Sequence, residues 1–208
     1  MADDTILLLK NLPWQQDPVS SLAIYMALDL GLRKGELLSR RWEDVRLKQG
    51  QQGALWVGTR VENGEVTWKT KTKSSRTIPL TPGLRMALEE ELIRQGQPTT
   101  GWVFPSSKVP ENPLGTFRGT LVAACKRAGL PVLHPHALRH TWATRMAVKG
   151  VPRPITMALG GWKSPSVLET VYQHSVSDLE AGAIAGAALP KVERGAEKGG
   201  KVVRFGRG

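Results

Sequence analysis

The stretch that constrains this chain most runs from residue 134 to residue 172 and reads HPHALRHTWATRMAVKGVPRPITMALGGWKSPSVLETVY. Its first part predicts a helix on which His136, Arg139 and His140 stand at positions i, i+3 and i+4 and share one face. Such a face can bind an anion. Trp162 and Tyr172 follow, and a phenol that lies beside cationic groups is a candidate nucleophile. The segment therefore predicts an anion site with a nucleophile close to it.

The charge of the chain points to a polyanionic partner. The formal charge is +11 and the isoelectric point is near 10.2, which is large for 208 residues. Nucleic acid is the commonest partner of a protein with such an excess. The last twenty residues hold six Lys or Arg against two Glu, so they contribute +4 and leave +7 on the rest of the chain. A basic tail alone does not explain the charge.

Cysteine usage and hydropathy favour an intracellular, soluble protein. Cys125 is the only cysteine, so no intrachain disulfide can form and a reducing compartment is expected. No apolar run approaches the roughly 18 residues that suggest a membrane span. The acidic start MADDTILLLK also differs from a secretory signal.

The N-terminal part predicts a loose leader followed by helices. Residues 1–17 look like the leader. Asp17 or Ser20 then caps a strongly apolar, buried helix that ends at Gly31. In residues 32–47 the apolar side chains continue with helical spacing.

The middle of the chain predicts strands. The segments ALWVGTRV and EVTWKTK flank Asn63-Gly64, a pair suited to a tight hairpin turn, and RTIPL reads as a third strand. These three segments predict a small antiparallel sheet.

The second half of the chain predicts further helices, each opened by a capping residue or a proline. Two of these helices are expected to start at Thr81-Pro82 and Asn112-Pro113. Two more are expected from about Pro135 to Lys149 and from about Ile155 to Leu159, and a last one is expected to start at Ser164-Pro165 and to lead to Tyr172. A weaker alanine-rich helix is expected at 178–188, and a basic, disordered tail at 189–208. The fold class is therefore α+β, a mainly helical domain over residues 18–188 with a small three-stranded antiparallel sheet.

Four boxes of the sequence, in this order, resemble the motifs of the tyrosine recombinases, the phage integrase family. They are GLRKGELL, KTKSSRTIPL, HALRH and LGGWKSPSVLETVYQH, and the resemblance covers residues 18 to 178. One box alone is a weak signal, but four in order with ordinary gaps are specific. Members of this family normally carry a separate N-terminal domain that clamps DNA. Because the first arginine box begins near residue 33, we expect that core-binding domain to be absent.

The resemblance assigns catalytic roles that the chemistry supports. Arg33 and Arg139 would clamp the scissile phosphate, because guanidinium groups stay protonated and present forked donors to phosphate oxygens. Tyr172 would attack phosphorus and form a 3′-phosphotyrosine link. Lys71 would be the general acid for the departing 5′ oxygen. Lys69 and Lys73 share its hairpin face by the period of two, and they remain alternatives.

The remaining site residues are expected to support this chemistry. His136 would either donate a hydrogen bond to the phosphate or help to remove the phenolic proton. Trp162 stands where many relatives have histidine, and its indole N–H can donate a hydrogen bond but cannot carry a proton. Glu36 is close enough to Arg33 to hold its guanidinium. His140 is expected to be a buried, hydrogen-bonding residue of its helix.

The resemblance implies an enzyme that cleaves and rejoins DNA in site-specific recombination, such as the integration or excision of a mobile element. Double-stranded DNA would be its partner, and it would self-associate on DNA as a tetramer in the active synapse. We expect a bacterial or phage-encoded protein that is cytoplasmic and associated with the nucleoid. The sequence holds no Cys/His cluster, no paired-metal carboxylates and no phosphate-binding glycine loop, so no cofactor and no metal are expected. The alternatives are relaxation of DNA like that of a type IB topoisomerase, and a non-catalytic DNA-binding regulator.

Overall fold

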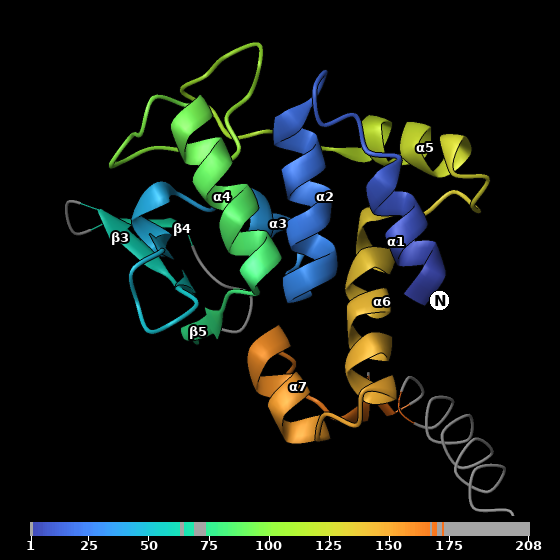
Figure 1. The fold of residues 1–208 in the computed structure, drawn as a ribbon. Helices are drawn as coiled ribbons and strands as arrows, with labels where there is room; N and C mark the ends of the chain where they lie inside the picture. The colour runs from blue at the N-terminus through green and yellow to red at the C-terminus, as the bar shows by residue number, and fades with distance from the viewer. Residues whose placement is uncertain (1, 63–64, 69–73, 167, 170–171, 173–208) are drawn as a thin grey trace, which may run out of the picture.

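The computed structural model describes residues 2–62, 65–68, 74–166, 168–169 and 172 (Figure 1). The helices of these residues are α1 (Ala2–Lys10), α2 (Pro18–Leu30), α3 (Lys34–Leu38), α4 (Pro82–Arg94), α5 (Arg118–Arg127), α6 (Pro135–Val148) and α7 (Arg153–Gly160), with a 3-10 helix, η1 (Trp42–Asp44). The strands are β1 (Val45–Arg46), β2 (Ala54–Val57), β3 (Arg60–Glu62), β4 (Glu65–Trp68) and β5 (Arg76–Pro79). The predicted α+β class, mainly helical with a small three-stranded antiparallel sheet, is confirmed.

Helix α2 is the centre of the fold. It lies between α4 and α6 in Figure 1 and contacts α3 and α5 as well. Most of its side chains are buried, as its uniformly apolar sequence predicts. The side chain of Asp17 caps it by accepting a hydrogen bond from Ser20 N at 3.1 Å, and the helix ends at Gly31 in the left-handed conformation, φ 63°.

The N-terminal residues are part of the core, so the expectation of a loose leader is wrong. Residues 2–10 form α1, and Leu8 and Leu12 join the main hydrophobic cluster. Arg127, at the end of α5, donates a hydrogen bond of 2.7 Å to the backbone oxygen of Asn11. The apolar run that follows the acidic start therefore serves packing.

The three-stranded sheet has the order β1-β2-β5 and is antiparallel throughout, but its strands differ from the predicted ones. The predicted strand ALWVGTRV divides at residues 58–59 into β2 and β3, and β3 pairs with β4 in a separate hairpin. At Gly58 a Cβ atom would lie 2.2 Å from the ring of Trp56, so the ring occupies the space that a side chain would fill. Val45, expected to continue a helix, starts the short strand β1 instead.

Helix α4 starts at its predicted position, α6 and α7 start and end close to theirs, and α5 starts later than predicted. The expected start at Asn112-Pro113 is wrong because this segment is extended. Leu114 N donates to Phe104 O at 2.7 Å, and the helix begins only after Phe117. The predicted helix at 178–188 and the basic tail at 189–208 lie outside the described residues. None of the helices that the structure describes has the length and apolarity needed to cross a membrane.

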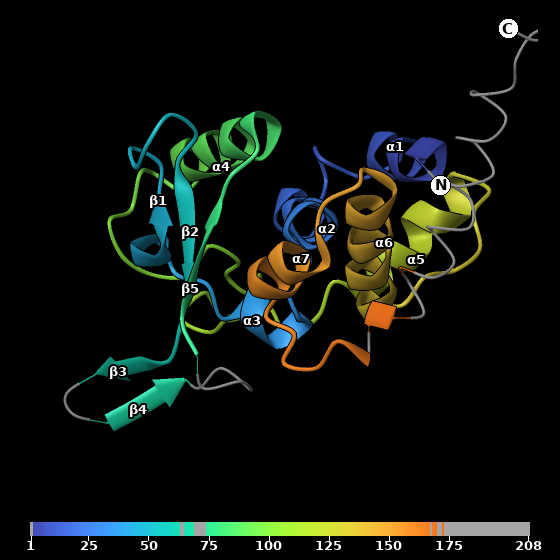
Figure 2. The same ribbon diagram turned by 90° about the horizontal axis from the view of Figure 1, so that it is seen from below.

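Helix α7 connects the helical part of the fold to the sheet. Helix α7 contacts both α6 and β5, and Figure 2 shows it between them, with α3 close by. Segments that are far apart in the sequence thus meet at the end of α7.

Candidate active site

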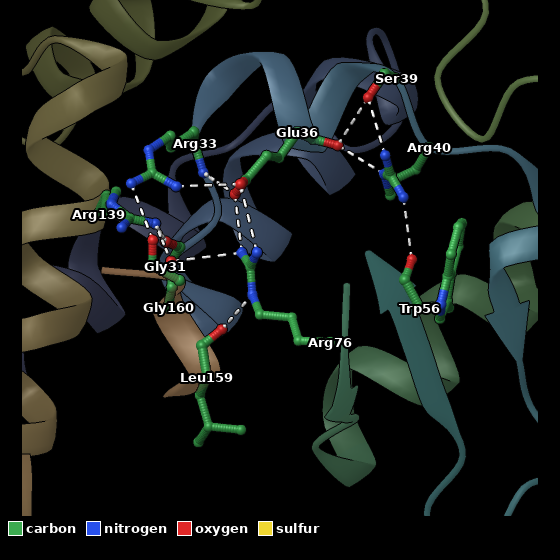
Figure 3. A network of polar contacts seen from close by, with 11 residues as sticks. Gly31, Arg33, Glu36, Ser39, Arg40, Trp56, Arg76, Arg139, Leu159 and Gly160 are labelled. Carbon is green, nitrogen blue, oxygen red and sulfur yellow. Dashed lines mark hydrogen bonds and ion pairs between the residues drawn. The ribbon is translucent and has the colours of Figure 1, made fainter. Parts of the chain in front are cut away.

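A buried carboxylate organises the site. Glu36 is 2% exposed, and it is the third residue of α3. Its Oε1 lies 3.1 Å from Arg33 Nη1, while its Oε2 accepts from Arg33 N at 3.2 Å. Arg76, from β5, lies on the other side, with Nη2 2.8 Å from Glu36 Oε2 (Figure 3). The predicted pair of Arg33 and Glu36 is confirmed, and Arg76 forms a second ion pair with the same carboxylate.

The Glu36 carboxyl is ionised at neutral pH. Its burial alone would raise the pKa. The hydrogen bond and charge of Arg76, together with the backbone hydrogen bond and charge of Arg33, outweigh the burial and bring the pKa below its ordinary value. With Arg139 nearby, three guanidinium charges against one carboxylate leave the cluster with a net charge of +2.

Arg139 is the most deeply buried arginine of the cluster, at 2% exposure. Its Nη1 donates to Gly31 O at 2.6 Å and to Gly160 O at 2.7 Å. Burial, and then the charge of Arg33, lower the pKa of Arg139 to about 9, so the side chain remains protonated at neutral pH. Its Nη2 is buried and has no hydrogen-bond partner within the part of the chain that the structure describes. Such a donor is costly unless an acceptor arrives, and an anion would supply one.

The end of α7 accepts hydrogen bonds from all three arginines. Arg76 Nε donates to the backbone oxygen of residue 159 at 2.8 Å, Arg139 Nη1 to that of residue 160, and Arg33 Nη2 to that of residue 161 at 3.0 Å. The last carbonyls of a helix have no partner inside it and carry partial negative charge. The three guanidiniums supply the missing donors and complement this charge.

The guanidinium of Arg139 packs on one of two stacked tryptophan rings. The guanidinium carbon of Arg139 lies 3.5 Å from the centre of the Trp162 ring, a cation–π contact. Trp162 stacks in turn on Trp142, with ring centres 5.8 Å apart and planes at 8°. Trp162 thus contacts Arg139 through the face of its ring. Donation by its indole N–H to a phosphate stays a prediction.

Both histidines of α6 are exposed, so the expectation that His140 is buried is wrong. On α6 the inward position belongs to Arg139, and His140 meets the ring of His136 edge to face at 5.0 Å. Partial desolvation, and then the charges of His140, Arg139 and Arg33, lower the pKa of His136. At neutral pH a large share of His136 is therefore uncharged and able to accept a proton.

Tyr172 lies at the other end of α7 and is buried, with 8% exposure. Its hydroxyl donates to Val151 O at 2.8 Å and lies 2.6 Å from Thr156 Oγ1. Its ring packs among residues of α6, and Arg153 lies 5.5 Å from the ring centre. The hydrogen bonds of the predicted nucleophile are therefore made at the start of α7, whereas the arginines gather at its end.

A second buried arginine group lies behind α3 and connects it to the strands. Arg40, at 1% exposure, donates to Glu36 O at 2.7 Å and to Trp56 O at 3.0 Å, and its Nη1 lies 3.1 Å from Asp44 Oδ2 (Figure 3 shows the first two). Its guanidinium carbon also lies 4.7 Å from the ring centre of Trp68, on β4. The β3–β4 hairpin is thus attached to the same helix as Glu36.

Sequence reasoning brought most of the site together and missed part of it. Arg33, Glu36, Arg139 and Trp162 meet as predicted, while Lys71, with Lys69 and Lys73, lies outside the described residues. The sequence assigns Arg76 only to a strand of the predicted sheet. Its signal was the strand period of two, since Arg76 and the buried Ile78 share a face. Among the described residues no group of three or more His, Cys, Asp or Glu could hold a metal ion.

Comparison with known proteins finds relatives of this chain among integrases and recombinases. The model of the phage integrase family matches residues 3–178. A XerC-like tyrosine recombinase from Caldanaerobacter subterraneus subsp. tengcongensis is 28% identical over 181 residues, covering 76% of this chain and 46% of that protein. The integrase of Salmonella phage P22 is 23% identical over 201 residues, covering 89% of this chain and 48% of the integrase. The chain therefore spans about half the length of these relatives.

Solved structures share the fold. The XerA recombinase has a TM-score of 0.69 at 17% identity, covering 88% of this chain and 62% of that one. The XerH recombinase, solved with its palindromic difH substrate after cleavage, has a TM-score of 0.67 at 18% identity, covering 89% of this chain and 52% of that one.

Proposed function

Because this chain belongs to the phage integrase family of tyrosine recombinases, we propose that it cleaves and rejoins DNA by transesterification, with Tyr172 as the nucleophile. The observation that carries the proposal is the arginine cluster around Glu36. It has a net charge of +2, and one of its buried donors, Arg139 Nη2, has no acceptor in the described part of the chain. An oxygen of a phosphodiester would supply that acceptor.

The cluster suits the transition state of the reaction. When the phenolic oxygen of Tyr172 bonds to phosphorus and the bond to the 5′ oxygen breaks, negative charge grows on the non-bridging phosphate oxygens. Guanidiniums that are already fixed stabilise this charge without reorganising, and loss of one such donor in other enzymes costs about 3 to 4 kcal/mol. We assign the contact with the phosphate to Arg33 and Arg139.

Protons must move at both oxygens. The phenolic proton leaves as the new bond forms, and we assign its removal to His136, which lies on α6 and has a lowered pKa. The departing 5′ oxygen takes a proton from a general acid, which we assign to Lys71. The reverse of these steps joins a new 5′ hydroxyl and releases Tyr172. The bond energy is kept in the phosphotyrosine link, so no nucleotide triphosphate is consumed.

Attack requires Tyr172 to leave its present partners. Its hydroxyl is bonded to Thr156 and Val151, which are neutral groups. Neutral hydrogen bonds contribute about 1 kcal/mol each. We infer that the arrangement seen in the structure is a resting state, and that the hydroxyl gives up these two neutral hydrogen bonds when it moves to the arginines.

We propose double-stranded DNA as the partner, and assembly into a tetramer on it. The charge of +11 supports a polyanionic partner. Similar recombinases support DNA in particular, since XerH and the integrase of transposon Tn1549 were solved in complex with it. Integration or excision of a mobile element in the bacterial cytoplasm is the use we propose.

Covalent capture tests the proposal. The protein is incubated in EDTA with a nicked duplex whose short 5′-hydroxyl fragment diffuses away after cleavage, and the products are run on a denaturing gel. A random-sequence duplex library supplies the site. We expect a DNA-linked protein band that is lost in Tyr172→Phe, while DNA binding persists. The matched control is Tyr25→Phe, which changes the second of the two tyrosines and should keep the band.

A DNA-binding regulator would bind the library and form no adduct. An adduct in Tyr172→Phe would disprove the assignment of the nucleophile. Loss of the adduct in EDTA with its return on adding Mg²⁺ would disprove the metal-independent mechanism.

A further inference from the structure

Arg76 holds two parts of the site at once. It is the first residue of β5, and its side chain is 10% exposed. Its Nη2 and Nη1 reach the two carboxylate oxygens of Glu36 at 2.8 and 3.4 Å, a forked contact. Its Nε donates to Leu159 O at 2.8 Å, and Nη2 also reaches Gly160 O at 3.4 Å. The strand is thus bonded to both α3 and α7.

The contacts of Arg76 differ from those of the two arginines assigned to the phosphate. Each of its three nitrogens already donates within the protein. By contrast, Arg33 has 25% of its side chain exposed, and Arg139 has a nitrogen without a partner among the described residues. Arg76 is therefore committed to protein groups, which is what a residue that orients others requires.

Close packing at Gly161 links Arg76 to the other arginines. A Cβ atom at Gly161 would lie 2.7 Å from Arg76 Nη1 and 2.8 Å from its Cζ, so the guanidinium rests against the backbone there. Gly161 has φ 69°, and its backbone oxygen accepts a hydrogen bond from Arg33. Trp162, which supports Arg139, is next in the chain. The position of Arg76 therefore affects the surroundings of Arg33 and Arg139 alike.

We propose that Arg76 is a positioning residue for DNA cleavage, which sets the orientation of Arg33 through Glu36 and that of Arg139 through the end of α7. This inference rests on the proposed function. Its physical reason is geometric: small displacements of groups that meet a reacting phosphate are costly, and about 1 Å can slow a reaction about 100-fold.

The first variant is Arg76→Lys, which keeps the positive charge. An ammonium group is a single point of charge and cannot span Glu36 and the α7 carbonyls as the planar guanidinium does. The matched control is Arg94→Lys. Arg94 Nε also binds a buried carboxylate, Glu91 Oε2, at 2.7 Å, but both residues lie on α4. Thermal unfolding establishes that each variant is folded at the assay temperature.

Cleavage and binding are then measured separately on the nicked duplex. At saturating protein we expect the single-turnover cleavage rate of Arg76→Lys to fall about 100-fold, with the DNA dissociation constant unchanged within about twofold. Arg94→Lys should keep both values. A folded Arg76→Lys variant that cleaves at the normal rate would overturn the proposal, and so would a loss confined to binding.

The pH profile of cleavage gives a readout that a loss of stability alone would not move. The charged groups around the Glu36 carboxylate are Arg33, Arg76 and Arg139, with Arg40 behind α3. Without the fork of Arg76 the pKa of Glu36 should rise, so the acid limb of the rate should move to higher pH in Arg76→Lys. An unmoved acid limb would contradict a role through Glu36.

Amide hydrogen exchange separates this proposal from the proposed function. The amide of Trp162 donates to Met157 O at 3.0 Å, and its exchange should accelerate in Arg76→Lys but not in Arg94→Lys. If the wild-type protein forms no adduct, the proposed function fails. Unchanged exchange at residues 159–162 would overturn the positioning role by itself.

Discussion

The two ends of α7 hold the two halves of the proposed site in different ways. At its C-terminal end three charged guanidiniums donate to backbone carbonyls and surround a buried carboxylate. At its N-terminal end the hydroxyl of Tyr172 is held by the neutral groups of Thr156 and Val151. Hydrogen bonds to charged groups contribute about 1.5 to 3 kcal/mol each, and neutral ones about 1 kcal/mol. The hydrogen bonds at the charged end are therefore the stronger ones, and those of the proposed nucleophile are the more easily exchanged.

The largest effect should follow from removing the carboxylate at the charged end. Glu36→Gln leaves Arg33 and Arg76 without their buried counter-charge, and breaking such a pair costs about 3 to 5 kcal/mol. Urea unfolding measures the loss of stability. As a control, Glu91→Gln breaks the pair with Arg94, whose side chain is 47% exposed, and should cost less. Equal losses in the two variants would show that the cluster around Glu36 is not the more tightly held.

A smaller effect is expected from Gly161→Ala, which tests the packing of Arg76 at the same end. Any residue other than glycine is strained at φ 69°, by about 1 to 2 kcal/mol, and the new Cβ would also displace the guanidinium of Arg76. Gly150→Ala is a matched control, since Gly150 has φ 70° and nothing within 4 Å of the added Cβ. Urea unfolding should show a greater loss for Gly161→Ala, and the difference measures the contact with Arg76. Equal losses would mean that the guanidinium moves aside freely.

The neutral end should respond less. Thr156→Val removes the hydroxyl that lies 2.6 Å from the Tyr172 hydroxyl and keeps the shape of the side chain. We expect a loss of about 1 kcal/mol in stability. Because this contact holds the resting state, the single-turnover cleavage rate should be equal to or higher than that of the wild type. A rate tenfold lower would show that Thr156 belongs to the reactive arrangement.

The last effect appears only at acid pH, where protonation removes the charge of Glu36. The folded pKa of Glu36 lies below its ordinary value of 4.5, so its ion pairs contribute stability that is fully present above that pH. This contribution should be lost as the pH falls from about 4.5 through the folded pKa. Urea unfolding at a series of pH values measures it, and the Glu36→Gln variant should lack this part of the dependence. An identical dependence in both proteins would contradict the assignment.

Local signals in the sequence predicted the parts of the fold that depend on near neighbours. The cap at Asp17, one of the two residues expected, the helix end at Gly31 and the pair of Arg33 and Glu36 all follow from spacings of a few residues. The expectations that failed depend on tertiary contacts. Strand β1 exists because Val45 pairs with Leu55, and no pattern in residues 32–47 predicts this pairing.

The candidate site shows the same division. Arg139 and Trp162 could be predicted because their motifs are distinctive. The role of Arg76 could not, because its partners Glu36 and Leu159 are 40 and 83 residues away in the sequence. The sequence predicts a buried, hydrogen-bonding His140, but the helix turns it to solvent when Arg139 faces inward. The partner of the Tyr172 hydroxyl likewise depends on how α7 packs.

The carbonyls at the end of α7 have a consequence for mutagenesis. The acceptors of the three guanidiniums at residues 159–161 are main-chain oxygens, and every amino acid has one. Replacing the side chain of Leu159 therefore leaves its acceptor in place, and a survey of substitutions would assign this position to packing alone. Chemical synthesis can exchange the peptide linkage after residue 159 for an ester, whose carbonyl accepts hydrogen bonds more weakly. In this protein part of the candidate site is encoded by backbone geometry rather than by residue identity.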